Sequence, residues 1–347
     1  MTTRAQTLPR PGATFGVGSL PHRSLTQALE FVWNSTDIPT IPSLPRRSPM
    51  EGMIAQALVG IEGVSVGQYA SISVDVSAID VDHFITTDLN SEAYGAFAAF
   101  LNTFDKYNNG AKKVKWQFVG PVTLGVALVR IGIDPSIAFP LALQAVSSHV
   151  RELENEVARV CGDIKQIIVL DEPSMTEALE PGFHIGVEEV IDLISGALSV
   201  VDDGNISGLH CCGHVDWGAV LATGANVISV PVPSTSDESQ MAEMLVAASR
   251  ISDHLSHGGR IAWGAIRTDG PIAVSDERSW KALMESMCAL VRAGVDPLDL
   301  RRMSYVTPAC GLGTHSEAVA DRVFSNVRSV ATKVAEQATA SRLTLGS

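Results

Sequence analysis

The sequence QIIVLD, at Gln166–Asp171, decides the fold. It is a short β-branched run between two longer helical patterns, Pro135–Val160 before it and Val187–Val200 after it. A strand between amphipathic helices is typical of βα units and of a mostly parallel sheet. The same alternation continues outward along the chain in both directions, so we expect an α/β protein.

Eight such runs are predicted as strands, and a helical pattern follows each of them. Eight strand–helix units favour a closed (β/α)8 barrel, the TIM barrel, over an open doubly wound sheet. The predicted strands are Thr14–Gly18, Pro39–Ser43, Val114–Gly120, Gln166–Asp171, Ile206–Cys212, Val227–Val230, Arg260–Ala265 and Met303–Val306.

Two segments do not follow this repeat: a long helical stretch, Pro135–Val160, before the fourth predicted strand, and a run closer to the amino terminus. The run GVSVGQYASISVDVSAIDVDHFITTDL, from Gly63 to Leu89, alternates apolar and polar residues. It predicts an inserted hairpin or excursion at about residues 63–90. No Ser/Gly-rich linker, low-complexity tract or internal repeat divides the chain, so residues 1–347 are predicted to form a single barrel domain.

The composition excludes several classes of protein. Apolar residues make up 46% of the chain and charged residues 18%, which predicts a large buried core rather than disorder. The formal net charge is −13 and no basic run exceeds a pair, so neither nucleic acid nor an anionic membrane surface is an expected partner. The sequence shows no signal-peptide pattern and no apolar stretch long enough to span a membrane, which predicts a cytoplasmic protein.

The sequence GLHCCGH, Gly208–His214, is the sharpest candidate for chemistry. Side chains alternate along a strand, so His210 and Cys212 face one side and Cys211 faces the other. An imidazole and a thiolate two residues apart at the end of a barrel strand form half of a zinc site, although an ordinary buried pair has the same pattern. His214 is expected to be a capping or surface residue.

A second candidate follows the last predicted strand, in TPACGLGTH at Thr307–His315. Cys310 lies there in a loop at the barrel face where TIM-barrel enzymes keep their active sites. By itself this cysteine could equally be a small buried apolar residue. Together with His210 and Cys212 it would supply three ligands and leave a fourth zinc position open for a substrate.

Six motifs occur in the order found in a known family: GSLPH (Gly18–His22), GPVT (Gly120–Thr123), LDEPS (Leu170–Ser174), HCCG (His210–Gly213), AWGAIRTDGP (Ala262–Pro271) and PACGL (Pro308–Leu312). With them the chain resembles, over nearly its whole length, the C-terminal catalytic domain of cobalamin-independent methionine synthase. The wider superfamily includes zinc thiol methyltransferases that methylate coenzyme M, and the uroporphyrinogen decarboxylases.

The resemblance implies a zinc-dependent methyltransferase that moves a methyl group to a thiol, with homocysteine as the acceptor and methionine as the product. His210, Cys212 and Cys310 match the family's zinc-binding His-x-Cys and distant Cys. Zinc suits this reaction because it stabilises a thiolate over a thiol at neutral pH.

The resemblance also implies three substrate-binding residues. Asp171 matches the acidic residue that recognises the amino group of the acceptor, and Ser19 lies in the turn that receives its carboxylate. Glu172 is the acidic neighbour of Asp171 and is expected to support the site.

Several positions depart from the family pattern. Pro231 stands where methionine synthases carry a glutamate as a further zinc ligand. Ile266 or Arg267 takes the place of the histidine proposed as the general acid, and Ala127 takes the place of the tryptophan that stacks on folate. These differences favour a methyl-corrinoid protein over methyltetrahydrofolate as the methyl donor.

Two other functions stay open. Pro231 and Ile266 are compatible with a degenerate, non-catalytic barrel that binds a thiol or an amino acid. A decarboxylase similar to the uroporphyrinogen enzymes needs cations for a polycarboxylate and no metal. Arg46 and Arg47 suit that function, although a basic pair in a loop is more often a solvated surface feature.

Overall fold

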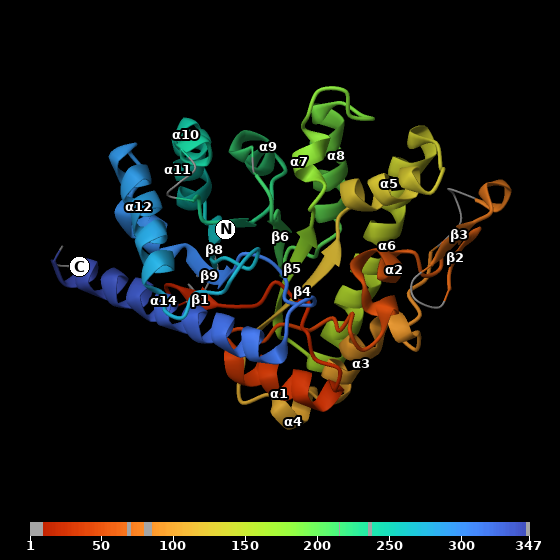
Figure 1. The fold of residues 1–347 in the computed structure, drawn as a ribbon, viewed down its shortest axis with the longest axis horizontal. Coiled ribbons are helices and arrows are strands. Elements are labelled where there is room, and N and C mark those ends of the chain that lie inside the picture. Colours follow the sequence, from red (N-terminus) through yellow and green to blue (C-terminus); the bar gives the residue numbers. More distant parts are fainter. Residues whose placement is uncertain (1–9, 68–70, 80–84, 215, 235–237, 345–347) are drawn as a thin grey trace, which may run out of the picture.

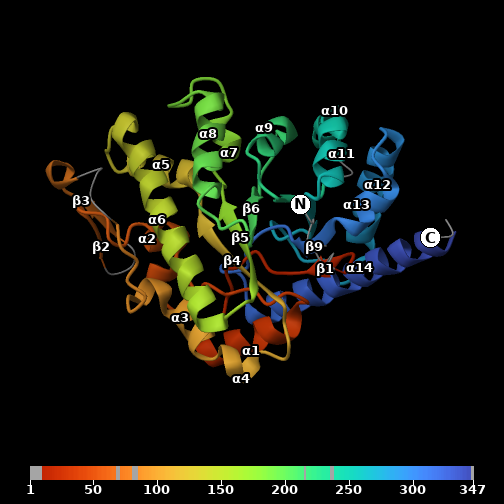
Figure 2. The same cartoon turned by 180° about the vertical axis from the view of Figure 1, so that it is seen from behind.

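The computed structural model describes residues 10–67, 71–79, 85–214, 216–234 and 238–344. It shows an α/β fold in which seven parallel strands form one curled sheet surrounded by helices (Figures 1 and 2). The strand order is β1-β9-β8-β7-β6-β5-β4, so consecutive strands from β4 to β9 lie side by side. The strands are β1 (Ala13–Thr14), β4 (Lys113–Val119), β5 (Lys165–Asp171), β6 (Ile206–His210), β7 (Val227–Pro231), β8 (Arg260–Ile266) and β9 (Ser304–Pro308).

The eighth predicted strand is not part of this sheet. The segment Pro39–Ser43 lies between β4 and the chain that follows β1, and it pairs with them at isolated bridges, Thr40 with Lys115 and Ser43 with Ser19. Pro39 and Pro42 have no backbone N–H, so this segment cannot sustain a hydrogen-bonded ladder. The predicted closed eight-stranded barrel is therefore confirmed only in its seven parallel strands, which form an open half-barrel.

The helices follow the strands as the sequence pattern predicts, with two interruptions. The predicted helix at Glu238–His254 is divided at Ala247, and the one predicted at Met50–Ile61 is a 3₁₀ turn, Pro49–Glu51, followed by a short helix. The helices are α1 (Leu25–Ser35), α2 (Met53–Ala57), α3 (Gly95–Asn102), α4 (Phe104–Tyr107), α5 (Pro121–Arg130), α6 (Pro135–Cys161), α7 (Met175–Ala178), α8 (Val187–Leu198), α9 (Trp217–Ala222), α10 (Glu238–Val246), α11 (Ala248–Ser256), α12 (Glu277–Arg292), α13 (Pro297–Arg302) and α14 (Glu317–Thr344). Among the described residues, none of these helices has the length and apolar character to cross a membrane.

The predicted excursion contains a two-stranded antiparallel hairpin, β2 (Val64–Val66) with β3 (Ile72–Val74). It projects from the periphery of the molecule, away from the parallel sheet (Figure 1). Residues 68–70 and 80–84 of the excursion lie outside the described residues.

Two apolar clusters show which way each strand residue faces. The smaller one lies on the concave face of the sheet and includes Ile206, Val227 and Ala262. The larger one fills the space between the sheet and the helices and includes Leu209 and Cys211. Because faces alternate along a strand, the side chain of His210, four residues beyond Ile206, points toward the concave face.

Candidate metal centre

The concave face carries three polar side chains in one row at the carboxyl ends of β5, β6 and β7. Asp171 is the register partner of His210, and His210 is the register partner of Ser229. All three are buried. Parallel strands place their carboxyl ends at one edge, which is where TIM-barrel enzymes bind their substrates.

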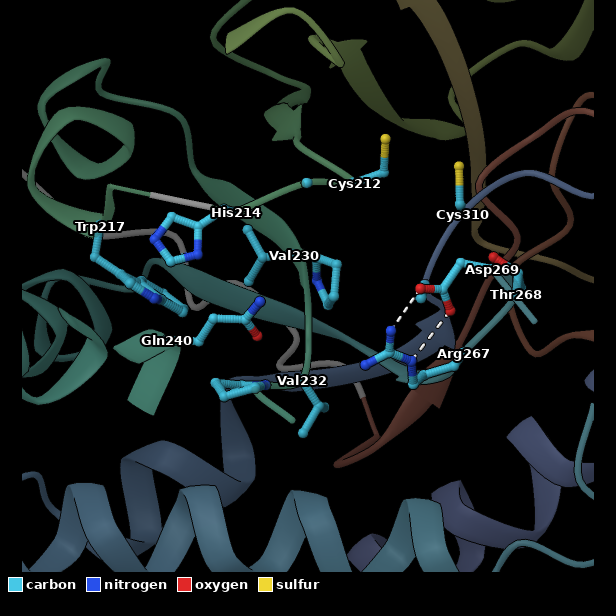
Figure 3. Close-up of a pocket in the computed structure, with 14 residues that line it drawn as sticks. Cys212, His214, Trp217, Val230, Val232, Gln240, Arg267, Thr268, Asp269 and Cys310 are labelled. Carbon is cyan, nitrogen blue, oxygen red and sulfur yellow. Dashed lines mark hydrogen bonds and ion pairs between the residues drawn. The ribbon is translucent and has the colours of Figure 1, made fainter. Parts of the chain in front are cut away.

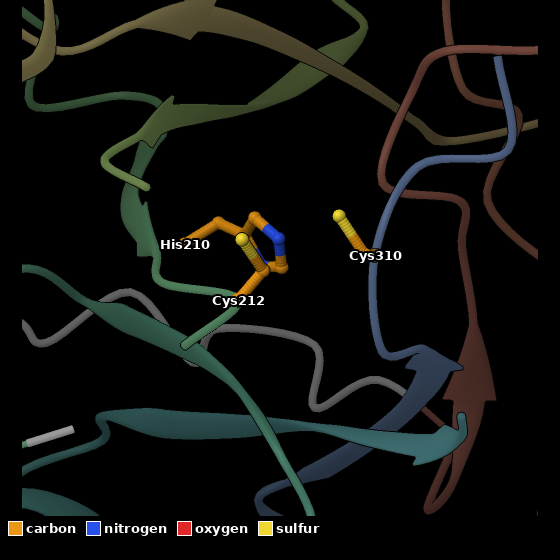
Figure 4. Close-up of side chains that lie close together, drawn as sticks. All are labelled: His210, Cys212 and Cys310. Atoms are coloured by element: carbon orange, nitrogen blue, oxygen red, sulfur yellow. The ribbon is translucent and has the colours of Figure 1, made fainter. Parts of the chain in front are cut away.

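The structure brings His210, Cys212 and Cys310 together. One possible ligand atom from each residue lies within 4.8 Å of the others, and the three side chains point toward a common centre (Figure 4). Cys212 follows β6 directly, and Cys310 lies in the loop after β9. That loop is held by hydrogen bonds from Ala309 N to Ile266 O (2.9 Å) and from Leu312 N to the carbonyl oxygen of Ser19 (2.8 Å).

The imidazole of His210 is oriented by a hydrogen bond with Ser229. Its Nδ1 lies 3.0 Å from Oγ of Ser229, while its Nε2 is buried without a hydrogen-bond partner. Buried polar atoms are nearly always paired, so an unpaired imidazole nitrogen beside two thiols has the chemistry of a metal ligand. In the tautomer that leaves Nε2 free, Nδ1–H donates to the Ser229 hydroxyl, the usual arrangement for a metal-binding histidine.

The two thiols have opposite pKa shifts. A hydrogen bond with the Cys310 thiol lowers the pKa of Cys212. The same bond, together with burial, raises the pKa of Cys310. Of the two sulfurs, that of Cys212 is therefore the one favoured as a thiolate, while that of Cys310 is favoured as a thiol. One unpaired imidazole nitrogen and two neighbouring sulfurs fit zinc, which binds nitrogen and sulfur ligands.

Cys211 lies on the opposite face, as strand alternation predicts. It is buried in the cluster between sheet and helices, with its Sγ 3.5 Å from Sδ of Met175. Burial raises the pKa of its thiol. A buried, neutral thiol of this kind is a packing residue rather than a metal ligand.

A cavity of about 330 Å³ opens beside the candidate metal centre, and we call it the acceptor cavity. Ser19 and Asp171 line it together with His210, Cys212 and Cys310. Oδ1 of Asp171 is buried without a hydrogen-bond partner, and burial raises the pKa of this carboxyl against the opposing charges of His210 and Lys115. The carboxyl of Asp171 is therefore available to a ligand that can donate a hydrogen bond.

Glu172 lies away from this cavity. Its side chain is fully buried and accepts hydrogen bonds from Val122 N (2.8 Å), Thr123 N (2.8 Å) and the Thr123 hydroxyl (2.6 Å), at the start of α5. Burial raises the pKa of Glu172 to about 7, although these hydrogen bonds oppose the shift. Its contacts are those of a helix cap that fixes α5 against β5, not those of a substrate ligand.

The sequence analysis did not identify Glu51, which also lines the acceptor cavity. Its carboxylate accepts hydrogen bonds from Leu44 N (2.6 Å) and from Nε of Arg47 (2.7 Å). Arg46 bonds the carbonyl oxygen of Thr314 (2.8 Å). The basic pair is thus engaged by the protein itself. An acidic residue four positions after Arg47 was the available signal for the ion pair.

Lys115 is a second residue that the sequence analysis missed. It points from β4 into the concave face, is 1% exposed, and donates hydrogen bonds to Val17 O and, at 3.0 Å, to Oε1 of Gln117. Burial lowers its pKa to about 8, opposed by the charge of Asp171. A charged residue at an inward position of the strand KVKWQFV was the signal.

A second cavity, of about 220 Å³, has Cys212 and Cys310 at its edge (Figure 3). Its wall carries the ion pair of the Arg267 guanidinium with Asp269. His214 also lines it, and Nε2 of His214 lies 2.7 Å from Oε2 of Glu243, which is outside the cavity wall. Pro231 lines this cavity and offers no side-chain ligand to the metal centre. Cys212 and Cys310 line both cavities.

Comparison with known proteins identifies the fold. No protein-family model and no curated protein sequence matches the chain. A methyltransferase from Methanosarcina mazei has a similar structure, with a TM-score of 0.55 at 13% identity over 94% of each chain. A protein from Listeria monocytogenes, provisionally described as a vitamin-B12-independent methionine synthase, gives 0.57 at 15% identity over 94% of this chain and 98% of that one. At such low identity the likeness shows a shared fold.

Proposed function

We propose that this chain is a zinc-dependent methyltransferase that moves a methyl group to a thiol. The observation that carries the proposal is the unpaired Nε2 of His210 beside the two sulfurs of Cys212 and Cys310, at the wall of a cavity. Zinc bound by these three residues would stabilise the substrate thiol as its thiolate. The fold shared with a methyltransferase and a methionine synthase-like protein supports the proposal.

Homocysteine is the proposed acceptor, and the acceptor cavity has complementary groups for its two charged ends. The buried carboxyl of Asp171 would receive the ammonium group, since its Oδ1 has no other partner. The Ser19 hydroxyl, which accepts a hydrogen bond from Gly313 N (3.4 Å), would lie near the substrate carboxylate. These two contacts would direct the sulfur toward Cys212 and Cys310.

The proposed reaction is a direct substitution. The acceptor sulfur attacks the methyl carbon in line, the new S–C bond forms as the bond to the donor breaks, and the electron pair leaves with the donor. The thiol would lose its proton to solvent before the attack, and because its sulfur attacks the methyl carbon directly, the protein need not form a covalent intermediate. Asp171 and Ser19 contribute by orientation, which places the reacting atoms close together.

A methyl-corrinoid protein is the proposed donor. A folate donor needs an acid to protonate its nitrogen, and the corresponding positions hold Ile266, which is buried, and Arg267, whose guanidinium is paired with Asp269 and stays protonated near neutral pH. Departure of cobalt requires no proton. We therefore expect little turnover with methyltetrahydrofolate.

A barrel that binds a thiol or amino acid without turnover is the alternative, because Pro231 leaves the metal centre without the additional ligand. Zinc binding with no methyl transfer from either donor would favour it. A decarboxylase has less support, since the guanidinium groups of Arg46 and Arg47 already bond Thr314 and Glu51.

Metal content is the decisive first measurement. Protein purified without chelator should contain one zinc per chain, and Cys212→Ser or Cys310→Ser should abolish binding, since a hydroxyl is a poor zinc ligand at neutral pH. Cys211→Ser is the matched control and should retain the metal, because its side chain lies on the other face. Loss of zinc from the Cys211 variant with retention in Cys212→Ser would contradict the site.

Activity is measured separately on zinc-loaded protein, with homocysteine as the acceptor and either methylcobalamin-loaded corrinoid protein or methyltetrahydrofolate as the donor. Methionine formed only with the corrinoid donor is the expected result. Efficient turnover with methyltetrahydrofolate would overturn the choice of donor.

A further inference from the structure

The opposite end of the sheet carries an unusual group of cations. Lys113, Lys165 and Arg260 are the first residues of β4, β5 and β8. Arg260 precedes Ala262 by two residues and Lys165 precedes Ile167 by two, and both apolar residues belong to the concave-face cluster. Since faces alternate, these cations point into the amino-terminal end of the concave face, which we call the amino-terminal pole.

Arg260 is buried there without a counter-ion. It is 3% exposed, and its Nε has no hydrogen-bond partner. Among the described residues, no carboxylate forms an ion pair with Arg260, Lys113 or Lys165. Burying an unpaired charge costs several kcal/mol, and buried arginines are normally paired.

A second unsatisfied group lies on the same face. The hydroxyl of Tyr305, on the neighbouring strand β9, is fully buried and has no hydrogen-bond partner. Tyr305 is the register partner of Ala262, two residues along β8 from Arg260. The positive charge of Arg260 opposes the rise that burial causes in the pKa of Tyr305, which indicates that the two groups are near one another.

The lysines share this electrostatic environment. Lys113 and Lys165 are register partners on adjacent strands and are partly exposed, so the pole is open to solvent on their side. Burial and the charges of Arg260 and Lys165 together lower the pKa of Lys113 to about 8. Three cations therefore repel one another at this pole, and an anion between them would relieve the repulsion.

We propose that the amino-terminal pole binds an inorganic oxyanion of the phosphate or sulfate class, held by Arg260, Lys113 and Lys165 with the Tyr305 hydroxyl as a further donor. A guanidinium presents several N–H groups in a planar fork that matches oxyanion oxygens. The site lies at the opposite end of the sheet from Cys212 and is independent of the proposed methyl transfer.

The test is a titration of the intact protein with inorganic phosphate at low millimolar concentration, with ionic strength held constant by sodium chloride. Wild-type protein should show a saturable rise in Tm of several degrees, because a ligand that binds only the native state stabilises it in proportion to ln(1 + [L]/Kd). Isothermal titration calorimetry should give the same Kd. General salt effects do not saturate in this range.

Arg260→Gln should weaken phosphate binding by about tenfold or more, the loss expected for hydrogen bonds to a charged group. Arg278→Gln, on the exposed surface of α12, is the matched control and should respond like the wild type. A saturable response of equal size in Arg260→Gln, or no saturable response in the wild type, would overturn the proposal.

Two further variants show whether a loss of phosphate binding comes from this site, from misfolding or from the metal centre. Lys113→Gln, at a partly exposed position of the same pole, should also weaken binding and serves if Arg260→Gln does not fold. Cys212→Ser should bind phosphate as the wild type does. Loss of zinc with retained phosphate binding would separate failure of the metal centre from failure of this site.

Discussion

Ser229 should control zinc affinity without touching the metal. Its hydroxyl lies 3.0 Å from Nδ1 of His210, and both side chains are buried at the ends of neighbouring strands. This hydrogen bond holds the ring so that Nε2 faces Cys212 and Cys310. Ser229→Ala removes one oxygen atom and leaves the strand and all three ligands in place.

The size of the effect follows from the buried imidazole. Removing the hydroxyl leaves Nδ1 without a partner, which costs about 1–3 kcal/mol. Loss of the group that orients a metal-binding histidine typically weakens metal binding by about 10–100-fold, equal to about 1.4–2.8 kcal/mol. The first cost falls on the metal-free and the zinc-bound protein alike and lowers stability. The second concerns the orientation of the ring, so zinc affinity should fall by about 10–100-fold in Ser229→Ala.

Competition with a chromophoric chelator measures this affinity. Ser207→Ala is the matched control, because its hydroxyl is exposed on β6 and bonds Asn226, away from the metal centre. It should bind zinc as tightly as the wild type. Equal affinity in Ser229→Ala and wild type, or equal losses in both serine variants, would refute the role of this hydrogen bond.

Two further predictions concern stability. Burial lowers the pKa of His149 from 6.5 to about 4, so the unfolded chain binds more protons between these pH values. Stability should therefore fall by roughly 3 kcal/mol as the pH is lowered through this window, and urea unfolding of His149→Gln should lack this part of the slope. At Gly120 an alanine Cβ would overlap the carboxylate of Glu172, so Gly120→Ala should cost about 1–3 kcal/mol in thermal unfolding. Gly270→Ala has open space around its Cβ and should be nearly neutral, and an equally stable Gly120→Ala would contradict the packing of Glu172.

Most of the parallel sheet was predictable because its strands are buried on both faces. Between its polar ends, the run at Gln166–Asp171 is continuously apolar and mostly β-branched. Such a run is specific for a buried parallel strand when it recurs between helices. The segment Pro39–Ser43 has the same apolar character, yet whether it pairs depends on backbone donors. Pro39 and Pro42 lack backbone donors and so argue against a paired strand. The eightfold repeat of strand and helix patterns nevertheless led to the prediction of a strand there.

The candidate metal centre was partly predictable for a similar reason. Alternation along a strand is a local rule, so it separated Cys212 from Cys211 without knowledge of the fold. The contacts of Glu172 could not be predicted from the neighbouring sequence, because they depend on how closely the start of α5 approaches the end of β5. The four-residue spacing of Arg47 and Glu51 is a local signal for their ion pair, but the place of Glu51 in the wall of the acceptor cavity depends on how their loop folds.

The irregular segment Pro39–Ser43 makes one side of the acceptor cavity easier to deform than the other. From β4 through β9 to β1 the backbone is a continuous ladder, whereas this segment is attached at isolated bridges. Regions with fewer backbone hydrogen bonds open at lower free energy. Ser43 borders the acceptor cavity, whereas His210 belongs to the continuous ladder and Cys212 lies two residues beyond it. The width of the cavity can therefore fluctuate on one side while the imidazole and the neighbouring thiol on the other keep their spacing.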